Sequence, residues 1–171
     1  MLGPFVRWRC NRFARKDGVQ PVMVAQAYNA ARRRRAISWL LVIVWAGVIF
    51  YMSSRTGSNL SSGFFGMVKE WATNLLNTIF GYHEDPLSPI CHFFEYLVLG
   101  MLLCNALGLR HVWGEALLLA IVIASAYGVT DEIHQIFVPE RMCDPLDWLT
   151  DTCGATLGAA IWAVLRIRHG F

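Results

Sequence analysis

Hydrophobic residues form four long runs along this 171-residue chain, separated by polar segments. A helix needs roughly 20 apolar residues to cross about 30 Å of membrane hydrocarbon, and each run is near that length. The expected spans are Ala36–Met52, Pro89–Leu109, Val112–Thr130 and Pro145–Leu165. Helix is also expected to extend back from the first span through 22–31 and forward from the third to Phe137. The pattern predicts an all-α fold, a polytopic membrane helix bundle with about four transmembrane helices.

A second pattern lies in the polar segment between the first two spans. From Ser62 to Phe80, hydrophobic residues recur at helical spacing and polar residues fill the positions between them. The hydrophobic set is Phe64, Val68, Trp71 and Leu75, and the polar set is Lys69, Glu70, Thr73, Asn74 and Asn77. This pattern predicts an extracytoplasmic amphipathic helix lying on the outer membrane surface. A short helix that caps the bundle explains it equally well.

Composition and charge support a membrane protein and orient it. The chain is 56% hydrophobic and only 16% charged, which excludes an ordinary soluble domain. Basic residues precede the first span, notably at Arg32–Arg35, and follow the last at Arg166 and Arg168, so the positive-inside tendency places both termini in the cytoplasm. The chain then divides into a basic cytoplasmic tail (1–35), a transmembrane domain (36–165) and a short basic tail (166–171).

A basic tail beside a membrane span typically contacts anionic lipid headgroups, which is a simpler interpretation than nucleic-acid binding. Membrane lipids are therefore expected partners, and nucleic acid is not. The sequence does not indicate the oligomeric state.

In this orientation, ten polar residues that are far apart in the sequence fall at or near one depth beneath the outer surface. Ionisable side chains are costly at membrane depth and persist mainly where they pair, line a wet cavity or carry out a function. Residues three or four apart share a helix face, so each helix gathers its polar residues on one side. The candidate site residues are His92, Glu95, Tyr96, Asp131, Glu132, His134, Gln135, Arg141, Asp147 and Asp151.

Glycines on the fourth span indicate which of these residues face inward. Asp147 and Asp151 lie on the same helical stripe as Gly154 and Gly158. Glycines four residues apart allow a neighbouring helix to approach closely, so we expect this stripe to face the interior of the bundle. Asp144 precedes a proline at the start of the same span, and we interpret it as a helix N-cap.

Binding without chemistry is the least demanding use of these residues. The outward N-termini of the second and fourth spans attract anions, and Arg141 offers a fork for phosphate or carboxylate. The surplus carboxylates accept hydrogen bonds from hydroxyl, amide or ammonium groups. A zwitterionic or sugar-bearing headgroup in the outer leaflet therefore fits better than a plain polyanion.

Three other interpretations stay open. No cofactor is expected, but a divalent metal held by histidine and carboxylate side chains on facing helices is an alternative. Its candidate ligands are His92, Glu95, Asp131, Glu132 and His134. Either histidine, oriented by a carboxylate, is also suited to acid–base catalysis on a lipid headgroup, although no nucleophile elbow, P-loop or zincin motif accompanies it. The third interpretation is a purely structural hydrogen-bond network.

The five cysteines show no metal-binding spacing. They are Cys10, Cys91, Cys104, Cys143 and Cys153. Three of them, at 91, 143 and 153, fall near the expected outer face, which leaves one disulfide open. We favour buried, inert thiols.

The order of these polar residues resembles the VanZ-like family of small bacterial membrane proteins. The resemblance rests on three motifs, His92-x-x-x-Tyr96-x-x-Leu99, Glu132-x-x-Gln135-x-Phe137-x-Pro139-x-Arg141 and Asp147-x-x-x-Asp151-x-x-Gly154-x-x-x-Gly158. Tyr51-Met-Ser-Ser54 is similar to the opening signature of that family. The resemblance covers roughly Val44 to Trp162.

The resemblance implies a multi-pass protein of the bacterial cytoplasmic (inner) membrane. The family is named for a member linked to low-level resistance to teicoplanin, a glycopeptide with a lipid tail, so a lipid-linked cell-wall precursor or a lipoglycopeptide is an expected partner. The implied polar core is His92, Tyr96, Glu132, Gln135, Arg141 and Asp147. This chain departs from the family at Pro89, Glu140 and Asp151, where a basic residue, glycine and asparagine are common. The two extra acids argue against a plain anionic ligand.

Overall fold

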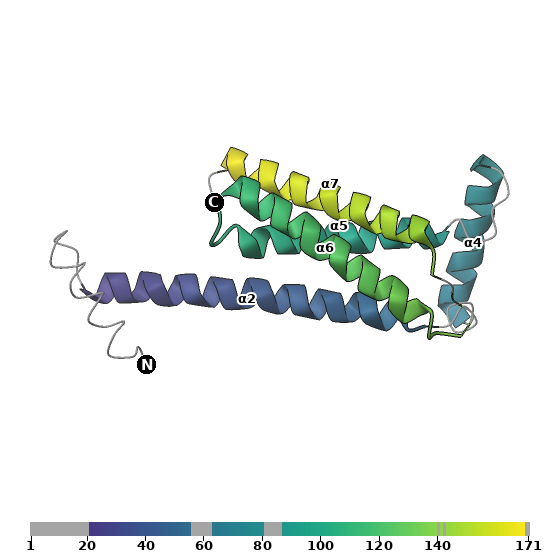
Figure 1. The fold of residues 1–171 in the computed structure, drawn as a ribbon, viewed down its shortest axis with the longest axis horizontal. Coiled ribbons are helices and arrows are strands. Elements are labelled where there is room, and N and C mark those ends of the chain that lie inside the picture. Colours follow the sequence, from purple (N-terminus) through teal and green to yellow (C-terminus); the bar gives the residue numbers. More distant parts are fainter. Residues whose placement is uncertain (1–20, 56–62, 81–86, 140, 142, 170–171) are drawn as a thin grey trace. The chain divides into compact units, whose positions relative to one another are not determined.

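The computed structural model of the protein describes residues 21–55, 63–80, 87–139, 141 and 143–169. The regular structure in this part of the chain is entirely α-helical (Figure 1). The helices are α2 (Pro21–Ser53), α4 (Gly63–Phe80), α5 (Leu87–Leu107), α6 (Trp113–Gln135) and α7 (Pro145–His169). The all-α prediction is therefore confirmed.

The chain divides into two compact units, residues 1–40 and 41–171, and the boundary falls inside α2. The described part of the first unit is the first half of α2, which begins at Pro21 and includes Arg32–Arg35. Proline suits the first position of a helix because its missing N–H would have no partner there. The expected helix before the first span is confirmed. The basic residues between Arg7 and Lys16 lie outside the described residues.

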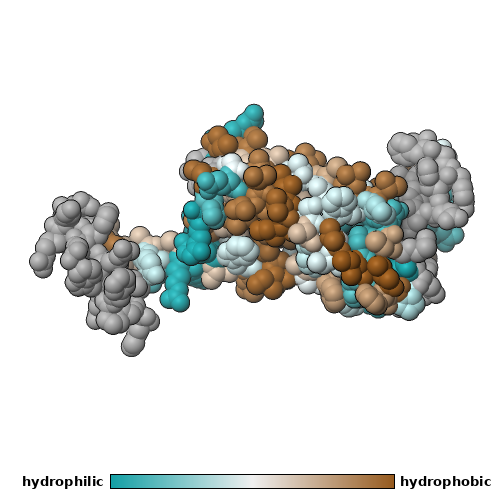
Figure 2. Space-filling model, viewed as in Figure 1, coloured by the Kyte–Doolittle hydropathy of each residue, from teal (hydrophilic) through white to brown (hydrophobic). Residues whose placement is uncertain are grey.

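Four helices are long and apolar enough to cross a membrane, as the hydrophobic pattern predicts. They are Val22–Ser53, Leu87–Leu107, Gly114–Gln135 and Pro145–Arg168. Many large hydrophobic side chains on them point outward, including Leu118 and Val122 on α6. Figure 2 shows such hydrophobic side chains covering much of the visible face of the helices. Soluble monomers rarely expose apolar surface on this scale, so membrane lipid is the solvent that suits this exterior.

Helices α5 and α7 approach each other closely because glycine occupies their contact. A Cβ atom on Gly154 would collide with the backbone carbonyl of Phe93, and one on Gly158 would collide with that of Leu97. Gly100 plays the reciprocal role against the carbonyl of Ala155. The expected inward-facing stripe of α7 is thus confirmed. Small residues let backbones touch where no hydrophobic effect drives helices together.

Helix α6 completes this group of three packed helices, which lie side by side in Figure 1. Its buried hydrophobic residues are alanines, at positions 116, 120 and 124, so it also packs through a small-residue face. The second half of α2 is attached by hydrogen bonds to backbone carbonyls. Trp45 donates to the carbonyl of Glu95 at 2.9 Å, and Tyr127 donates to that of Ala46 at 2.7 Å.

Helix α4 confirms that the segment after the first span is helical. The described hydrophobic side chains Met67, Trp71 and Leu75 are exposed. An apolar, exposed helical face suits either a membrane surface or a covering role over the bundle. The location of α4 at the outer membrane surface stays a prediction.

Candidate functional site

Polar side chains from four helices meet at one end of the second unit. The C-terminal ends of α2 and α6 and the N-terminal ends of α5 and α7 supply them, so the up-and-down order of the helices brings the residues together. Hydrogen bonds and the proximity of possible ligand atoms divide them into two groups. The Ser53 cluster consists of Ser53, Asp131 and Gln135, and the His92 cluster consists of His92, Glu132 and Asp151.

The Ser53 cluster ties α2 to α6. The hydroxyl of Ser53 donates to Oδ2 of Asp131 at 2.8 Å and accepts a hydrogen bond from Nε2 of Gln135 at 2.9 Å. Gln135 also reaches the same carboxylate oxygen, at 3.4 Å. All three side chains are buried. Buried polar groups are usually hydrogen-bonded, and here α2 and α6 supply hydrogen-bond partners to each other.

His134 faces α2, beside the Ser53 cluster. Its Nε2 lies 3.0 Å from the hydroxyl of Ser54, and its ring stacks on Phe50 with the centroids 4.4 Å apart. The imidazole is half-buried. His134 therefore contacts a serine and an aromatic ring of α2. It is not one of the residues whose side chains lie close enough together to hold a metal ion, which are His92, Glu132 and Asp151.

The His92 cluster joins α5, α6 and α7. Nδ1 of His92 lies 3.1 Å from Oδ1 of Asp151, although the two residues are 59 positions apart in the chain. Glu132 completes the cluster, in which each residue offers one atom and these atoms all lie within 4.8 Å of one another. Each of the three residues is at most 5% exposed. An imidazole and two carboxylates are thus packed together inside a bundle whose helices are apolar enough to cross a membrane.

Glu132 also fixes the loop that leads into α7. Its Oε2 accepts a hydrogen bond from the backbone N–H of Asp144 at 2.8 Å. The Asp144 side chain in turn accepts from the N–H of Leu146 at 2.9 Å, which confirms Asp144 as the N-cap of α7. The loop and the start of α7 are therefore tied to α6 through one carboxylate.

Several buried polar atoms near these clusters have no hydrogen-bond partner within the described part of the chain. They are Oδ1 of Asp131, Oε1 of Glu132, Oδ2 of Asp151, the Tyr96 hydroxyl and Nε of Arg141. Tyr96 is completely buried and lies within electrostatic range of Asp151 and Asp131. Leaving a buried polar atom unpaired is costly, so a concentration of such atoms points to a ligand, an ion or water.

The remaining candidates lie at the edge of this region. Glu95 and Arg141 are half-buried, and Asp147 is half-buried in the first turn of α7. The backbone carbonyl of Glu95, rather than its carboxylate, makes the contact with Trp45 described above. The ten candidates thus gather at one end of the bundle, but they do not form a single cluster.

Two residues of the site were not among the sequence candidates. Ser53 is the bridge between Asp131 and Gln135, and its only signal was its place in the Tyr51-Met-Ser-Ser54 signature. Gly128 lies on α6 next to Asp151, and a Cβ added there would lie 3.3 Å from Oδ2 of Asp151. Glycine therefore lets α6 approach this part of α7 closely, because even a Cβ atom would be tight there. A lone glycine in an apolar helix gives no such signal.

The expectation of buried thiols is wrong for three of the four described cysteines. Cys91, Cys143 and Cys153 are exposed, and only Cys104 is buried. No disulfide joins these four, while Cys10 lies outside the described residues. The α5–α7 contact is made by glycine and alanine, so the cysteines at 91 and 153 face outward.

Cys143 lies in the loop before α7, outside the membrane spans. Partial removal from water, followed in importance by the nearby carboxylate of Glu132, raises the pKa of the Cys143 thiol. Both effects disfavour the thiolate, which is the reactive form of cysteine. This exposed thiol is therefore expected to react slowly.

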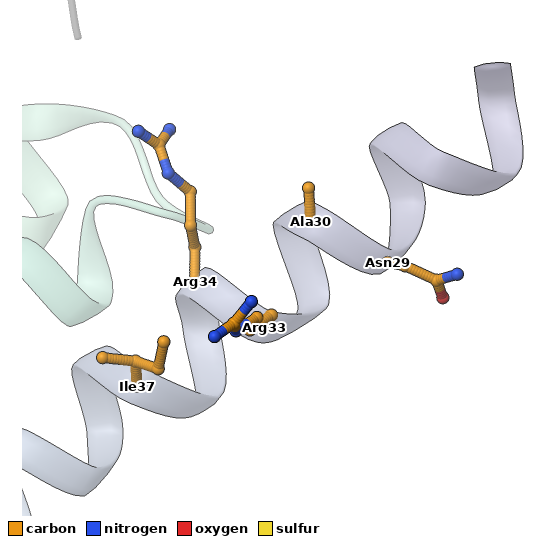
Figure 3. Close-up of a pocket in the computed structure, with 5 residues that line it drawn as sticks. All are labelled: Asn29, Ala30, Arg33, Arg34 and Ile37. Atoms are coloured by element: carbon orange, nitrogen blue, oxygen red, sulfur yellow. The ribbon is translucent and has the colours of Figure 1, made fainter.

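A shallow hollow lies along α2 in the first unit, away in sequence from the polar clusters. Figure 3 shows that its lining side chains project from a single stretch of that helix. They are Asn29, Ala30, Arg33, Arg34 and Ile37. The arginines suit anionic headgroups at a membrane surface, and we assign no specific ligand here.

The fold and the site define a multi-pass α-helical membrane protein whose polar side chains converge at one end of the bundle. The chain belongs to the VanZ/LLP1 family, which it matches over residues 38–166. This match confirms the family that the motifs indicate and includes both polar clusters. No curated protein and no solved structure matches the chain.

Proposed function

We propose that this protein binds a lipid-linked headgroup or a lipoglycopeptide-type molecule at the outer leaflet of the bacterial cytoplasmic membrane. The polar end of the bundle is the binding region, and both termini lie in the cytoplasm. The observation that carries the proposal is the set of buried polar atoms without partners, supplied by α5, α6, α7 and the loop at Arg141. A headgroup offers hydroxyl, amide and phosphate groups that would satisfy them.

The balance of charge supports a headgroup with donors as well as acceptors. Asp131, Glu132 and Asp151 are all nearly inaccessible, so the region is rich in carboxylate oxygens. Carboxylates accept hydrogen bonds from hydroxyl, amide and ammonium groups. Arg141 and the N-terminus of α5 supply the complementary positive end for a phosphate or carboxylate. A sugar-bearing or zwitterionic headgroup matches both halves.

Membership of the VanZ/LLP1 family supports the link to glycopeptides. If this protein binds teicoplanin, or competes with teicoplanin for the lipid-linked cell-wall precursor, cells that contain the protein gain more resistance to teicoplanin than to vancomycin, which has no lipid tail. The contribution would depend on the polar clusters, because the apolar exterior alone only holds the protein in the membrane.

The test uses purified full-length protein in lipid nanodiscs and two probes, teicoplanin and vancomycin. Binding is followed by quenching of tryptophan fluorescence, since Trp148 lies near the polar end and donates to the carbonyl of Ser125. We expect saturable binding of teicoplanin, at least about tenfold weaker binding of vancomycin, and a clear loss in Glu132→Gln and Asp147→Asn.

Asp144→Asn is the matched control. It removes one negative charge from the same end of the bundle, but asparagine caps helices as well as aspartate does. Equal binding by wild-type protein and all three variants would overturn the proposal. It would also be overturned if folded wild-type protein binds no teicoplanin and cells with and without the protein are equally sensitive to it. A lipid-linked cell-wall precursor in the same nanodiscs distinguishes a headgroup ligand from the drug itself.

A second candidate function is an intramembrane enzyme that acts on a lipid headgroup. The observation that favours it is the buried contact between Nδ1 of His92 and Asp151, because a carboxylate that orients an imidazole is the usual arrangement of a general base. Turnover of a headgroup-labelled lipid by wild-type protein, lost in His92→Gln, would favour the enzyme over the binding protein.

A further inference from the structure

We propose that His92, Glu132 and Asp151 bind one divalent cation at the polar end of the bundle. The three side chains come from α5, α6 and α7, so the ion would join all three packed helices. This inference deepens the proposed function and rests on it only for the role of the ion, which is to receive an anionic group of the ligand. Binding of the ion itself can be measured without any lipid ligand.

The geometry is close to that of an occupied site. Ligand atoms 2.0–2.2 Å from a tetrahedral ion are about 3.3–3.6 Å apart. Nδ1 of His92 and Oδ1 of Asp151 lie 3.1 Å apart. One ligand atom from each of the three residues lies within 4.8 Å of the others. Three protein ligands also leave a fourth position open for water or a ligand oxygen.

Unpaired carboxylate oxygens supply the independent argument for an ion. Oε1 of Glu132 and Oδ2 of Asp151 are buried and have no hydrogen-bond partner within the described residues. Two carboxylates so close together repel each other, and a single imidazole cannot balance both. A divalent cation would neutralise this charge and take up the free lone pairs. In the Ser53 cluster, hydroxyl and amide donors reach Oδ2 of Asp131, and Oδ1 of that carboxylate is the oxygen left without a partner among the described residues. The grouping of possible metal ligands does not include Asp131.

The surroundings would hold an ion in place. Glycine at position 128 lets α6 pack closely against α7, since a Cβ added there would lie 3.2 Å from Cδ1 of Trp148 and 3.3 Å from Oδ2 of Asp151. Oε2 of Glu132 accepts from the N–H of Asp144, which orients the carboxylate as an outer-shell contact does in metal sites. The cluster lies near the ends of the three helices rather than at their middle.

The ligand chemistry selects the class of ion. One nitrogen and two carboxylate oxygens suit zinc, manganese and iron, whereas calcium takes six to eight oxygens and magnesium keeps several waters. The three described exposed cysteines would bind zinc adventitiously, because thiolates prefer it. Manganese avoids thiols and has an electron paramagnetic resonance (EPR) signal, so Mn²⁺ is the probe of choice.

The experiment uses full-length, tag-free protein in detergent, stripped with a chelator. Mn²⁺ is titrated while EPR measures the free ion, Zn²⁺ then competes for the site, and thermal unfolding is followed with and without metal. We expect one Mn²⁺ per chain, displacement by Zn²⁺ and a higher midpoint of unfolding. Glu132→Gln and Asp151→Asn should each weaken binding by at least about 100-fold, because loss of a direct ligand exceeds the 10–100-fold effect of an outer-shell change.

Asp131→Asn is the control variant, since it alters a buried carboxylate next to Glu132 that belongs to the Ser53 cluster. It should keep the metal affinity of the wild type. The proposal is overturned if folded wild-type protein binds Mn²⁺ no better than Glu132→Gln, or if Asp131→Asn loses binding equally. Metal binding without teicoplanin or precursor binding would sink the proposed function and leave the ion in place.

Discussion

Nδ1 of His92 and Oδ1 of Asp151 lie 3.1 Å apart inside the bundle, where neither residue exceeds 5% exposure. His92 lies in the second turn of α5, and Asp151 lies in the second turn of α7. Their contact is made at the same interface where Gly154 packs against the carbonyl of Phe93. The close approach of two backbones and the pairing of two polar side chains are therefore parts of one arrangement.

The first prediction concerns this approach. Gly158→Val should destabilise the protein by about 3 kcal/mol, at the upper end of the range for overpacking, because its Cβ would meet the backbone carbonyl of Leu97, which cannot move as a side chain can. Unfolding by SDS, followed by circular dichroism in mixed micelles, measures the change.

Gly47→Ala is the matched control for Gly158→Val. Gly47 lies on α2 with nothing within 4 Å of an added Cβ, so alanine should be neutral or stabilising by up to about 1 kcal/mol. Equal stability of the two variants would contradict the packing described for α5 and α7.

The second prediction concerns the Ser53 cluster. Ser53→Ala removes the hydroxyl that donates to Asp131 and accepts from the amide of Gln135, so two buried groups lose a partner at once. We expect a loss of about 1–3 kcal/mol in the free energy of unfolding. Thr156→Ala is the comparison, because that hydroxyl donates to the carbonyl of Thr152, one turn earlier in the same helix. A Ser53→Ala protein as stable as Thr156→Ala would show that the cluster does not hold α2 in place.

The third prediction concerns the reactivity of Cys143. Because its thiol pKa is raised, little thiolate is present at pH 7, and alkylation should be slow and should accelerate as the pH rises. Glu132→Gln removes a negative charge beside the thiol, which lowers the pKa and should speed alkylation severalfold. Mass spectrometry of the peptide that contains Cys143 measures the rate. An unchanged alkylation rate in Glu132→Gln would show that the Glu132 carboxylate does not raise the pKa of the Cys143 thiol.

The fourth prediction concerns orientation in the membrane. A membrane-impermeant maleimide applied to intact cells at high pH should label Cys143, whereas a cysteine introduced as Arg110→Cys should be labelled only after the cells are permeabilised. Both positions lie outside the spans, on loops at opposite ends of α6. The reverse result would place the polar clusters on the cytoplasmic side and remove the case for an outer-leaflet ligand.

Several features of the fold could be predicted because they depend on local pattern. Four spans follow from the length of the hydrophobic runs, and the N-cap at Asp144 follows from the proline after it. The inward face of α7 follows from the spacing of Gly154 and Gly158, because glycine in a membrane helix marks a close contact. The exposure of the cysteines at 91 and 153 was not predicted. Which face of a helix its neighbours cover is decided by the packing of the small residues, and the spacing of the cysteines does not indicate that face.

The sequence alone determined that the polar residues share one end of the bundle, since alternating spans bring their polar ends to one depth. Tertiary structure alone decided that Asp131 serves Ser53 and Gln135, while the next residue, Glu132, joins His92 and Asp151. Adjacent residues on a helix point about 100° apart, so a small rotation of α6 would exchange their partners. That rotation is set by the packing of whole helices, which no local pattern of residues specifies.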